Sequence, residues 1–266
     1  MLTPVALRPP ARRSCLVRNE NPARTKGQLF ARASASPPAS LDDVTGGAPI
    51  LVIAPHPDDD VLGCGGLIAA CAAANVPVHI AYLTDGRRSH VGSAQWPGER
   101  LAAARRLEAI EGARALGLAP DALTFLPNRD GALLFDRNAR RRSLAALQIV
   151  ARRHGAARVF TTWIHDPHPD HVAAALIARE LCDLPPYPTQ LAYPVWGRFL
   201  PDGFVLRHRA RRALRFDVGA HAETKRRAFA AHRSQSTKLI DDAWFTLSPK
   251  RRQRETLLRE AEFFLV

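Results

Sequence analysis

From residue 48 onward, short apolar runs alternate with longer segments of helical periodicity, and this alternation constrains the fold more than any other feature. The first run, Ile50-Leu-Val-Ile53, is short and continuous, which is typical of a strand buried on both faces. An Ala-rich helical segment, 61–75, and a second strand-like run, 76–84, follow it. The alternation predicts a single α/β domain whose mostly parallel sheet is flanked by helices on both faces.

The rest of the chain continues the pattern. Further strands are predicted over 123–126, 158–162 and 190–193, with a hairpin over 205–217, and helices over 99–116, 143–154, 171–184, 220–233 and 248–263. The last helix is predicted to start at Ser248-Pro249, which has the chemistry of an N-cap followed by N1. No run of about 18 apolar residues occurs, so no transmembrane helix is expected.

The first polar loop follows the first strand directly and reads His56-Pro-Asp-Asp-Asp60. Three adjacent carboxylates repel one another, and a bound cation would relieve that repulsion. If the three acids are considered without the histidine, the alternative is a solvated turn or a helix N-terminus. The glycines of Gly63-Cys-Gly-Gly66 are expected to keep the helix start free of bulk and leave space for a ligand.

A second polar loop lies at the end of another predicted strand and contains three histidines in seven residues, His165-Asp-Pro-His168-Pro-Asp-His171. Ligand sites in α/β sheets lie beyond the carboxyl ends of strands, so the two loops are expected to meet. Two His and one carboxylate with an open position suit a divalent metal. That set fits catalytic zinc, and ferrous iron uses it as well.

The pair of motifs, His56-Pro-Asp-Asp and His168-Pro-Asp-His171, resembles the PIG-L/LmbE-like family of metal-dependent N-acetylglucosamine deacetylases. The matching segments in between are Gly65-Gly66, Leu83-Thr-Asp-Gly86, Arg105-x-x-Glu108, Leu116-Gly117 and Asp130-Gly131, with His232-Arg-Ser-Gln235 near the C-terminus. Asp60 stands where the family usually has Glu, and Gly112 where Ala is common. The resemblance implies one Rossmann-like deacetylase domain over residues 48–266.

The resemblance also implies roles for individual residues. His56, Asp59 and His171 would bind the metal, and Asp58 would be the general base. His168 would be the acid or the oxyanion partner, oriented by Asp170.

Substrate contacts are implied with more alternatives. The resemblance implies that Arg105 and Asp130 would bind sugar hydroxyls. The alternative for Arg105 is a helix-surface pair with Glu108, and the alternative for Asp130-Gly131 is a turn. His232 could equally be a packing residue. His165 and Asp166 are expected to line the mouth of the site. The irregular segment 89–96 is expected to form a rim or lid that sets specificity.

The function implied is hydrolysis of an N-acetyl group on an N-acetylglucosamine conjugate, with Zn²⁺, or alternatively Fe²⁺, as cofactor. A metal amidase for another N-acyl metabolite or glycan precursor is the alternative within enzymes. A binder of nucleic acid or of an anionic surface is disfavoured, because the chain has no nucleic-acid-binding motif and its Arg clusters lack interleaved aromatic residues. Four cysteines without a CxxC pair favour a reducing, cytoplasmic location. The oligomeric state is left open.

Residues 1–47 differ from the rest in composition. They contain seven of the 38 basic residues, three of the 25 acidic ones, and clusters of Pro and Ser, so they account for +4 of the net charge of +13. Without periodicity, this segment is predicted to be a disordered basic extension. An Arg-rich transit peptide is disfavoured by the prolines. The remaining charge is interpreted as solvated faces that could attract an anionic substrate.

Overall fold

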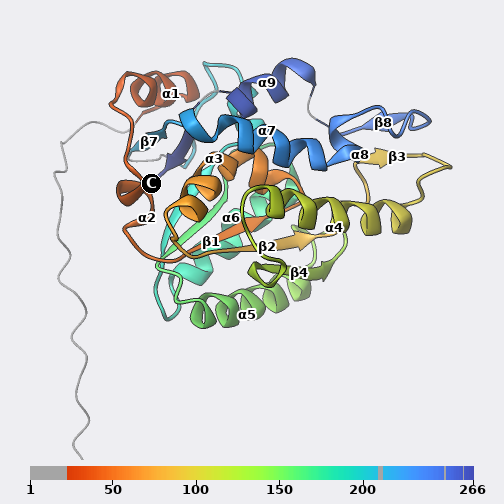
Figure 1. Ribbon diagram of the computed structural model, residues 1–266, viewed down its shortest axis with the longest axis horizontal. Coiled ribbons are helices and arrows are strands. Elements are labelled where there is room, and N and C mark those ends of the chain that lie inside the picture. Colours follow the sequence, from red (N-terminus) through yellow and green to blue (C-terminus); the bar gives the residue numbers. More distant parts are fainter. Residues whose placement is uncertain (1–22, 209–211, 249, 260) are drawn as a thin grey trace, which may run out of the picture.

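The computed structural model describes residues 23–208, 212–248, 250–259 and 261–266, and its centre is a seven-stranded sheet in the order β4-β2-β1-β5-β6-β9-β7 (Figure 1). The strands are β1 (Ile50–Ala54), β2 (Val78–Thr84), β4 (Leu123–Asn128), β5 (Arg158–Thr162), β6 (Thr189–Tyr193), β7 (Ala213–Phe216) and β9 (Glu262–Leu265). The strands from β4 to β6 are parallel, and β9 pairs antiparallel with both β6 and β7. The predicted α/β architecture is therefore confirmed.

Helices cover both faces of this sheet. They are α1 (Lys26–Ala35), α2 (Leu41–Thr45), α3 (Asp59–Ala73), α4 (Gly98–Ala115), α5 (Arg137–Arg153), α6 (Pro169–Cys182), α7 (Ala222–Ala231), α8 (Arg233–Ser236) and α9 (Arg251–Arg259). Short 3₁₀ turns lie at Pro120–Ala122, Trp196–Phe199 and Gly219–His221, and a separate pair of strands is formed by β3 (His90–Val91) and β8 (Phe245–Thr246).

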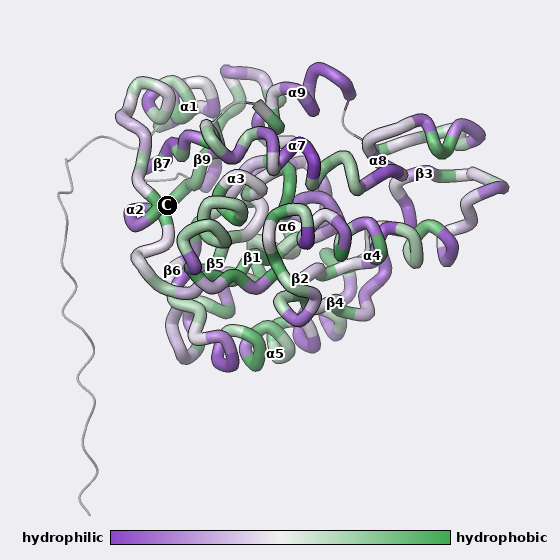
Figure 2. The backbone as a smooth tube through the Cα atoms, in the orientation of Figure 1, coloured by the Kyte–Doolittle hydropathy of each residue, from purple (hydrophilic) through white to green (hydrophobic). Residues whose placement is uncertain are grey.

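Strand β1 shows why the sheet needs cover on both sides. All five of its residues are buried, and they alternate between two cores. Ile50 and Val52 pack with α3, α4 and α7, whereas Leu51 and Ile53 pack with α5 and α6. Figure 2 shows the central strands as apolar segments surrounded by helices with polar outer faces. Because the order β2-β1-β5 reverses direction at β1, the carboxyl ends of β1 and β5 flank the switch point where such sheets bind ligands.

The C-terminal prediction needs correction. The helix expected over 248–263 is shorter, because α9 runs from Arg251 to Arg259 and residues 262–265 form strand β9 instead. These residues extend the sheet and pair with β7, so β7 is not part of a hairpin within 205–217. Aromatic Phe263 and Phe264 suit a buried pleated strand, and this tertiary pairing overrides the helical pattern before them.

The disorder predicted for residues 1–47 is also wrong for residues 23–47; residues 1–22 lie outside the described part of the chain. Helix α1 is capped by Thr25, and α2 by a capping box between Ser40 and Asp43. Leu29 and Val44 are buried, so both helices add to the cores. The fold therefore begins before residue 48. These helices bury too few residues each to show periodicity, and packing stabilises them.

The glycines after the first loop do not leave space for a ligand. A Cβ at Gly63 would clash with the ring of Tyr193, one at Gly65 with Lys225, and one at Gly66 with Val218. Each glycine therefore lets another element pack closely against α3. The small size of these residues is therefore needed for packing against α3, not for ligand binding.

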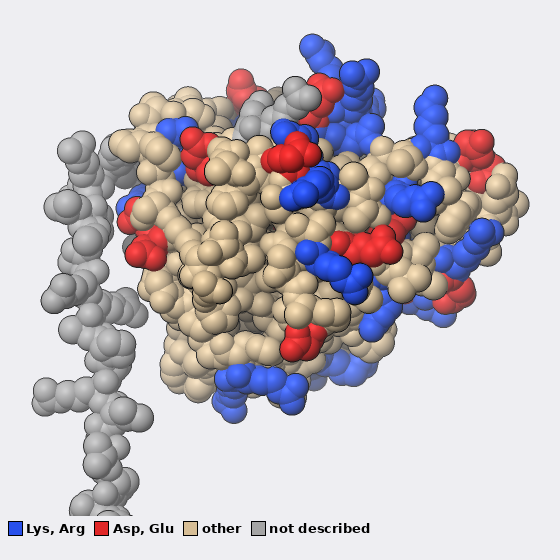
Figure 3. Space-filling model, viewed as in Figure 1, with Lys and Arg blue, Asp and Glu red and all other residues tan. Residues whose placement is uncertain are grey.

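The basic runs lie on the outside of the molecule. On the face in Figure 3, Lys and Arg side chains gather over α5 and α9. Among the helices of the described residues, none is long and apolar enough to cross a membrane.

Candidate active site

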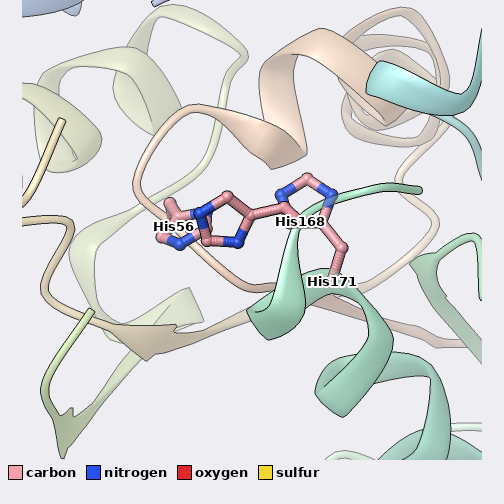
Figure 4. Close-up of side chains that lie close together, drawn as sticks. All are labelled: His56, His168 and His171. Carbon is pink, nitrogen blue, oxygen red and sulfur yellow. The ribbon is translucent and has the colours of Figure 1, made fainter. Parts of the chain in front are cut away.

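The two polar loops meet at the switch point, as predicted, and form one pocket. The residues lining it are His56, Asp58, Asp59, Leu62, Ser89, Arg105, Asp130, His168, Trp196, Gln235 and Leu247. All the predicted site residues belong to this wall except His171 and Asp170, which are fully buried behind it and contact it directly. Figure 4 shows His56, from the loop after β1, facing His168 and His171 at the start of α6.

The proposed metal ligands are brought together by Asp59. Its Oδ2 lies 3.1 Å from His56 Nδ1 and 3.2 Å from His171 Nε2. Ligands held about 2.0–2.1 Å from one tetrahedral zinc ion would be about 3.3 Å apart, so this spacing suits a shared cation. The three imidazoles of His56, His168 and His171 also each place a nitrogen within 4.8 Å of the others.

An unsatisfied nitrogen supports the same site. His171 Nε2 is buried and makes no hydrogen bond within the described residues, although Asp59 is close. Its other nitrogen, Nδ1, lies 2.9 Å from Asp166 Oδ2. A metal-binding imidazole characteristically directs its second nitrogen to a carboxylate in this way. These residues fit a divalent cation.

Carboxylates behind His56 complete a similar arrangement. His56 Nε2 lies 3.2 Å from Asp130 Oδ1 and 3.3 Å from Asp170 Oδ2. Asp170 also accepts the backbone N–H groups of Gly131 and Leu133. The carboxylate of Asp170 therefore contacts His56, whereas the resemblance implied that it would orient His168.

Asp58 occupies a strained position beside the ligands. Its φ of 136° is rare for a residue with a side chain and is a kind of strain found at functional sites. Its Oδ1 accepts a 2.9 Å hydrogen bond from Arg105, which also donates to the carbonyls of Pro57 and Gly86. Burial raises the pKa of Asp58 to about 7, with Arg105 opposing the shift.

His168 is the N-cap of α6, followed by Pro169 at the first helical position. Its Nδ1 accepts the backbone N–H of Asp170 at 3.2 Å. Burial and the neighbouring His56 and His171 lower the pKa of His168 to about 4. A neutral ring that accepts at Nδ1 carries its proton on Nε2. With Nδ1 occupied as an acceptor, Nε2 is the nitrogen of His168 that is left to donate a hydrogen bond.

The contacts of Arg105 and His232 bear on two alternatives left open by the sequence. Arg105 is buried and does not form a surface pair with Glu108, whose carboxylate instead accepts from the backbone and hydroxyl of Ser234. His232 is fully buried against Gly112, where a Cβ would lie 2.8 Å from its Nε2. His232 therefore packs closely against α4, and it is not among the residues that line the pocket.

Asp166 was expected at the mouth, and this is wrong. It is buried, and besides His171 it accepts the backbone N–H groups of Val195, Trp196 and Gly197. His165 contacts His208 and also lies outside the pocket wall.

Four wall residues were not predicted as site residues: Leu62, Trp196, Gln235 and Leu247. Gln235 ends the His232-Arg-Ser-Gln segment, and its side chain donates to Ser89. That segment was therefore a usable signal. Leu62, Trp196 and Leu247 are apolar residues without a motif, and only the fold brings them to the pocket.

Comparisons with known proteins place the chain among deacetylases. Residues 51–182 match the family model described as PIG-L: GlcNAc-PI de-N-acetylase. The diacetylchitobiose deacetylase of Thermococcus kodakarensis is 27% identical over 202 residues, which is 73% of each chain.

Two solved structures are similar in fold and sequence. N,N'-diacetylchitobiose deacetylase from Pyrococcus horikoshii is 27% identical, with a TM-score of 0.59 over 82% of this chain and 83% of that one. A conserved protein of Thermus thermophilus is 26% identical, with a TM-score of 0.58 over 82% of this chain and 93% of that one. Since the matched region runs from β1 through α6 and includes both loops of the pocket, this chain belongs to the PIG-L family.

Proposed function

We propose that this protein is a zinc-dependent N-deacetylase that removes the acetyl group from an N-acetylglucosamine conjugate, releasing acetate and a free amino sugar. One observation carries the proposal: buried nitrogen and carboxylate donors of His56, Asp59 and His171 converge beside a second carboxylate, Asp58, in a pocket at the switch point of the sheet. The names of the 27% identical relatives supply the acetamide substrate.

His56, Asp59 and His171 would hold the cation. Bound there, it would polarise the acetamide carbonyl and lower the pKa of a coordinated water. Two imidazoles with one carboxylate suit zinc, and the carboxylates behind each imidazole would orient the rings and increase their basicity.

Asp58 would act as the general base. It lines the pocket next to Asp59, and the hydrogen bond from Arg105 fixes its carboxylate. There it can accept a proton from the attacking water, and then deliver that proton to the nitrogen as the C–N bond breaks. Because Arg105 is held by two carbonyls and acts on Asp58, it is a positioning residue in this step.

His168 would stabilise the oxyanion. Its Nε2–H is free to donate because Nδ1 is engaged by the amide of Asp170. A fixed donor aimed at the developing charge stabilises a tetrahedral transition state. Asp130 and Arg105, both in the pocket wall, would contact the sugar hydroxyls.

The test combines metal content with acetate release. Purified protein should contain about one zinc per chain, and it should release acetate from N-acetylglucosamine or N,N'-diacetylchitobiose. Chelation should abolish this release, and zinc should restore it better than ferrous iron. A metal-loaded protein that releases no acetate from any N-acetyl sugar would contradict the proposal.

A further inference from the structure

A two-stranded flap, residues 89–96 and 242–247, stands beside the pocket. In it β3 and β8 run antiparallel, with His90 opposite Thr246 and Val91 opposite Phe245. Figure 1 shows the pair projecting from the body of the molecule next to α8. The segment 89–96, expected from sequence to form a rim or lid, is therefore one arm of a small sheet.

The flap has a fixed shape. The carboxylate of Asp242 accepts hydrogen bonds from the hydroxyl of Ser93, at 2.5 Å, and from the backbone N–H groups of Ala94 and Gln95, at 2.9 and 3.0 Å. One side chain of the second arm thus ties down the turn of the first.

Large apolar side chains lie exposed on this flap. Trp244 is 77% exposed and Phe245 is 47% exposed, and their ring centroids are 6.3 Å apart. Gly92 lies under the indole, since a Cβ there would clash with the Trp244 ring. The indole therefore rests against the backbone and leaves its other side to solvent. Adjacent exposed aromatic residues on a rigid element are typical of a binding surface, whereas single ones are not.

This aromatic surface is continuous with the pocket. Leu247, two residues beyond Phe245, is a wall residue of the pocket and is 37% exposed. Its backbone N–H donates to the carbonyl of Ser89, another wall residue, at 2.9 Å. A group attached to a sugar in the pocket can therefore pass from Leu247 onto Phe245 and Trp244.

Building on the proposed function, we propose that Trp244 and Phe245 form a platform that stacks against the sugar ring next to the reacting N-acetylglucosamine. The C–H face of a pyranose is apolar and nearly flat, so it buries area against an aromatic ring without a cavity. An alkyl chain would need a concave apolar groove. The proposed substrate class is therefore an N-acetylglucosamine oligosaccharide.

The test compares N,N'-diacetylchitobiose with N-acetylglucosamine as substrates of the full chain. In Trp244→Ala and Phe245→Ala, the ratio of kcat/KM for the disaccharide to that for the monosaccharide should fall about ten-fold, mostly through KM, because stacking far from the reacting bond is uniform binding. Trp244→Phe, which keeps a ring, should retain most of the ratio. Tyr187→Ala is the matched control. Tyr187 is 66% exposed, but it precedes β6 and so lies at the amino-terminal ends of the strands, whereas the pocket lies at their carboxyl ends.

The outcomes separate this proposal from the proposed function. If the wild type hydrolyses both sugars and the variants keep its ratio, the platform is wrong and the deacetylase stands. If the wild type hydrolyses neither sugar, calorimetric binding of the disaccharide decides: weaker binding by Trp244→Ala supports the platform, and no binding by the wild type overturns it. A fall in oligomeric mass in Trp244→Ala, with the ratio unchanged, would identify a contact between copies and also overturn it.

Discussion

Two groups of buried charges contact helix α3, one at its N-terminus and one on its flank. The first contains Asp58, Asp59 and the histidines of the pocket. The second is the ion pair of Lys225 and Glu262, 2.8 Å apart and both almost inaccessible to solvent.

The two groups differ in how completely their polar atoms are paired. Glu262 also accepts the N–H groups of Gly66 and Leu67, and Lys225 also donates to the carbonyl of Leu62. The pocket group, in contrast, contains a buried histidine nitrogen that makes no hydrogen bond to the described residues, and a residue at positive φ. A buried charge is costly unless it is fully paired. The paired group is a structural device, and the incomplete one is suited to a cation and a substrate.

The largest expected effect comes from Asp58→Asn. Loss of the base should lower kcat by about 10²–10⁴-fold, the usual contribution of general acid–base catalysis. Asn has nearly the same size and shape as Asp, and the ligands are untouched, so zinc content and unfolding free energy should stay near the wild-type values. Steady-state acetate release and elemental analysis on the same sample check this. Full activity with metal bound would remove Asp58 from the proposed mechanism.

Lys225→Met should act on stability and not on chemistry. It leaves the Glu262 carboxylate buried without its counter-charge, and breaking a buried pair in this way costs about 3–5 kcal/mol. Urea denaturation should show this loss, while the folded fraction keeps its zinc. Lys238→Met, at an exposed lysine, is the control and should unfold like the wild type. A Lys225→Met protein that is stable but has lost its zinc would contradict the assignment of a purely structural role to this ion pair.

The pocket group was largely predictable from sequence, and the ion pair was not. His56 and His171 stand in short motifs directly after apolar strands, and the loops after parallel strands meet at one edge of the sheet. Lys225 lies within an ordinary helical pattern, and Glu262 falls in a segment whose helical periodicity was misleading. Their contact spans 37 positions and depends on how α7 and β9 pack against α3. Periodicity carries no information on such packing.

Asp166 shows the same limit inside the site. Its place in the histidine-rich loop suggested an exposed position, but the three amides it accepts come from residues 195–197, which follow β6. The prediction of disorder failed for residues 23–47 for a related reason, because the burial of these residues depends on contacts with strands far along the chain. Site residues that stand in short motifs at strand ends could therefore be predicted. Residues whose role depends on a contact with a distant segment could not.

Asp166→Asn tests whether the carboxylate that contacts the proposed ligand His171 also contributes to zinc binding. An amide oxygen still accepts hydrogen bonds, but it carries no charge to hold the His171 ring and raise its basicity. Substitution of such a carboxylate typically lowers metal affinity about 10–100-fold. Competition with a chromogenic zinc chelator measures the change, with Asp183→Asn, at an exposed position, as control. Unchanged zinc affinity would mean that Asp166 serves only the backbone after β6.

The smallest effect concerns a buried ionisable group that has no counter-charge within hydrogen-bond distance among the described residues. His79 is 3% exposed, lies 2.8 Å from the Thr124 hydroxyl and stacks on His154. Burial, with a contribution from His154, lowers the pKa of His79 to about 4. Since its pKa in the unfolded chain is about 6.5, its neutral form favours folding above that pH. This contribution should decline as the pH falls from about 6.5 toward 4, by up to about 1 kcal/mol per pH unit.

His79→Gln cannot take up the proton, so its unfolding free energy should fall less than that of the wild type between pH 7 and pH 5. Parallel declines in urea denaturation at the two pH values would show that His79 keeps an ordinary pKa despite its burial.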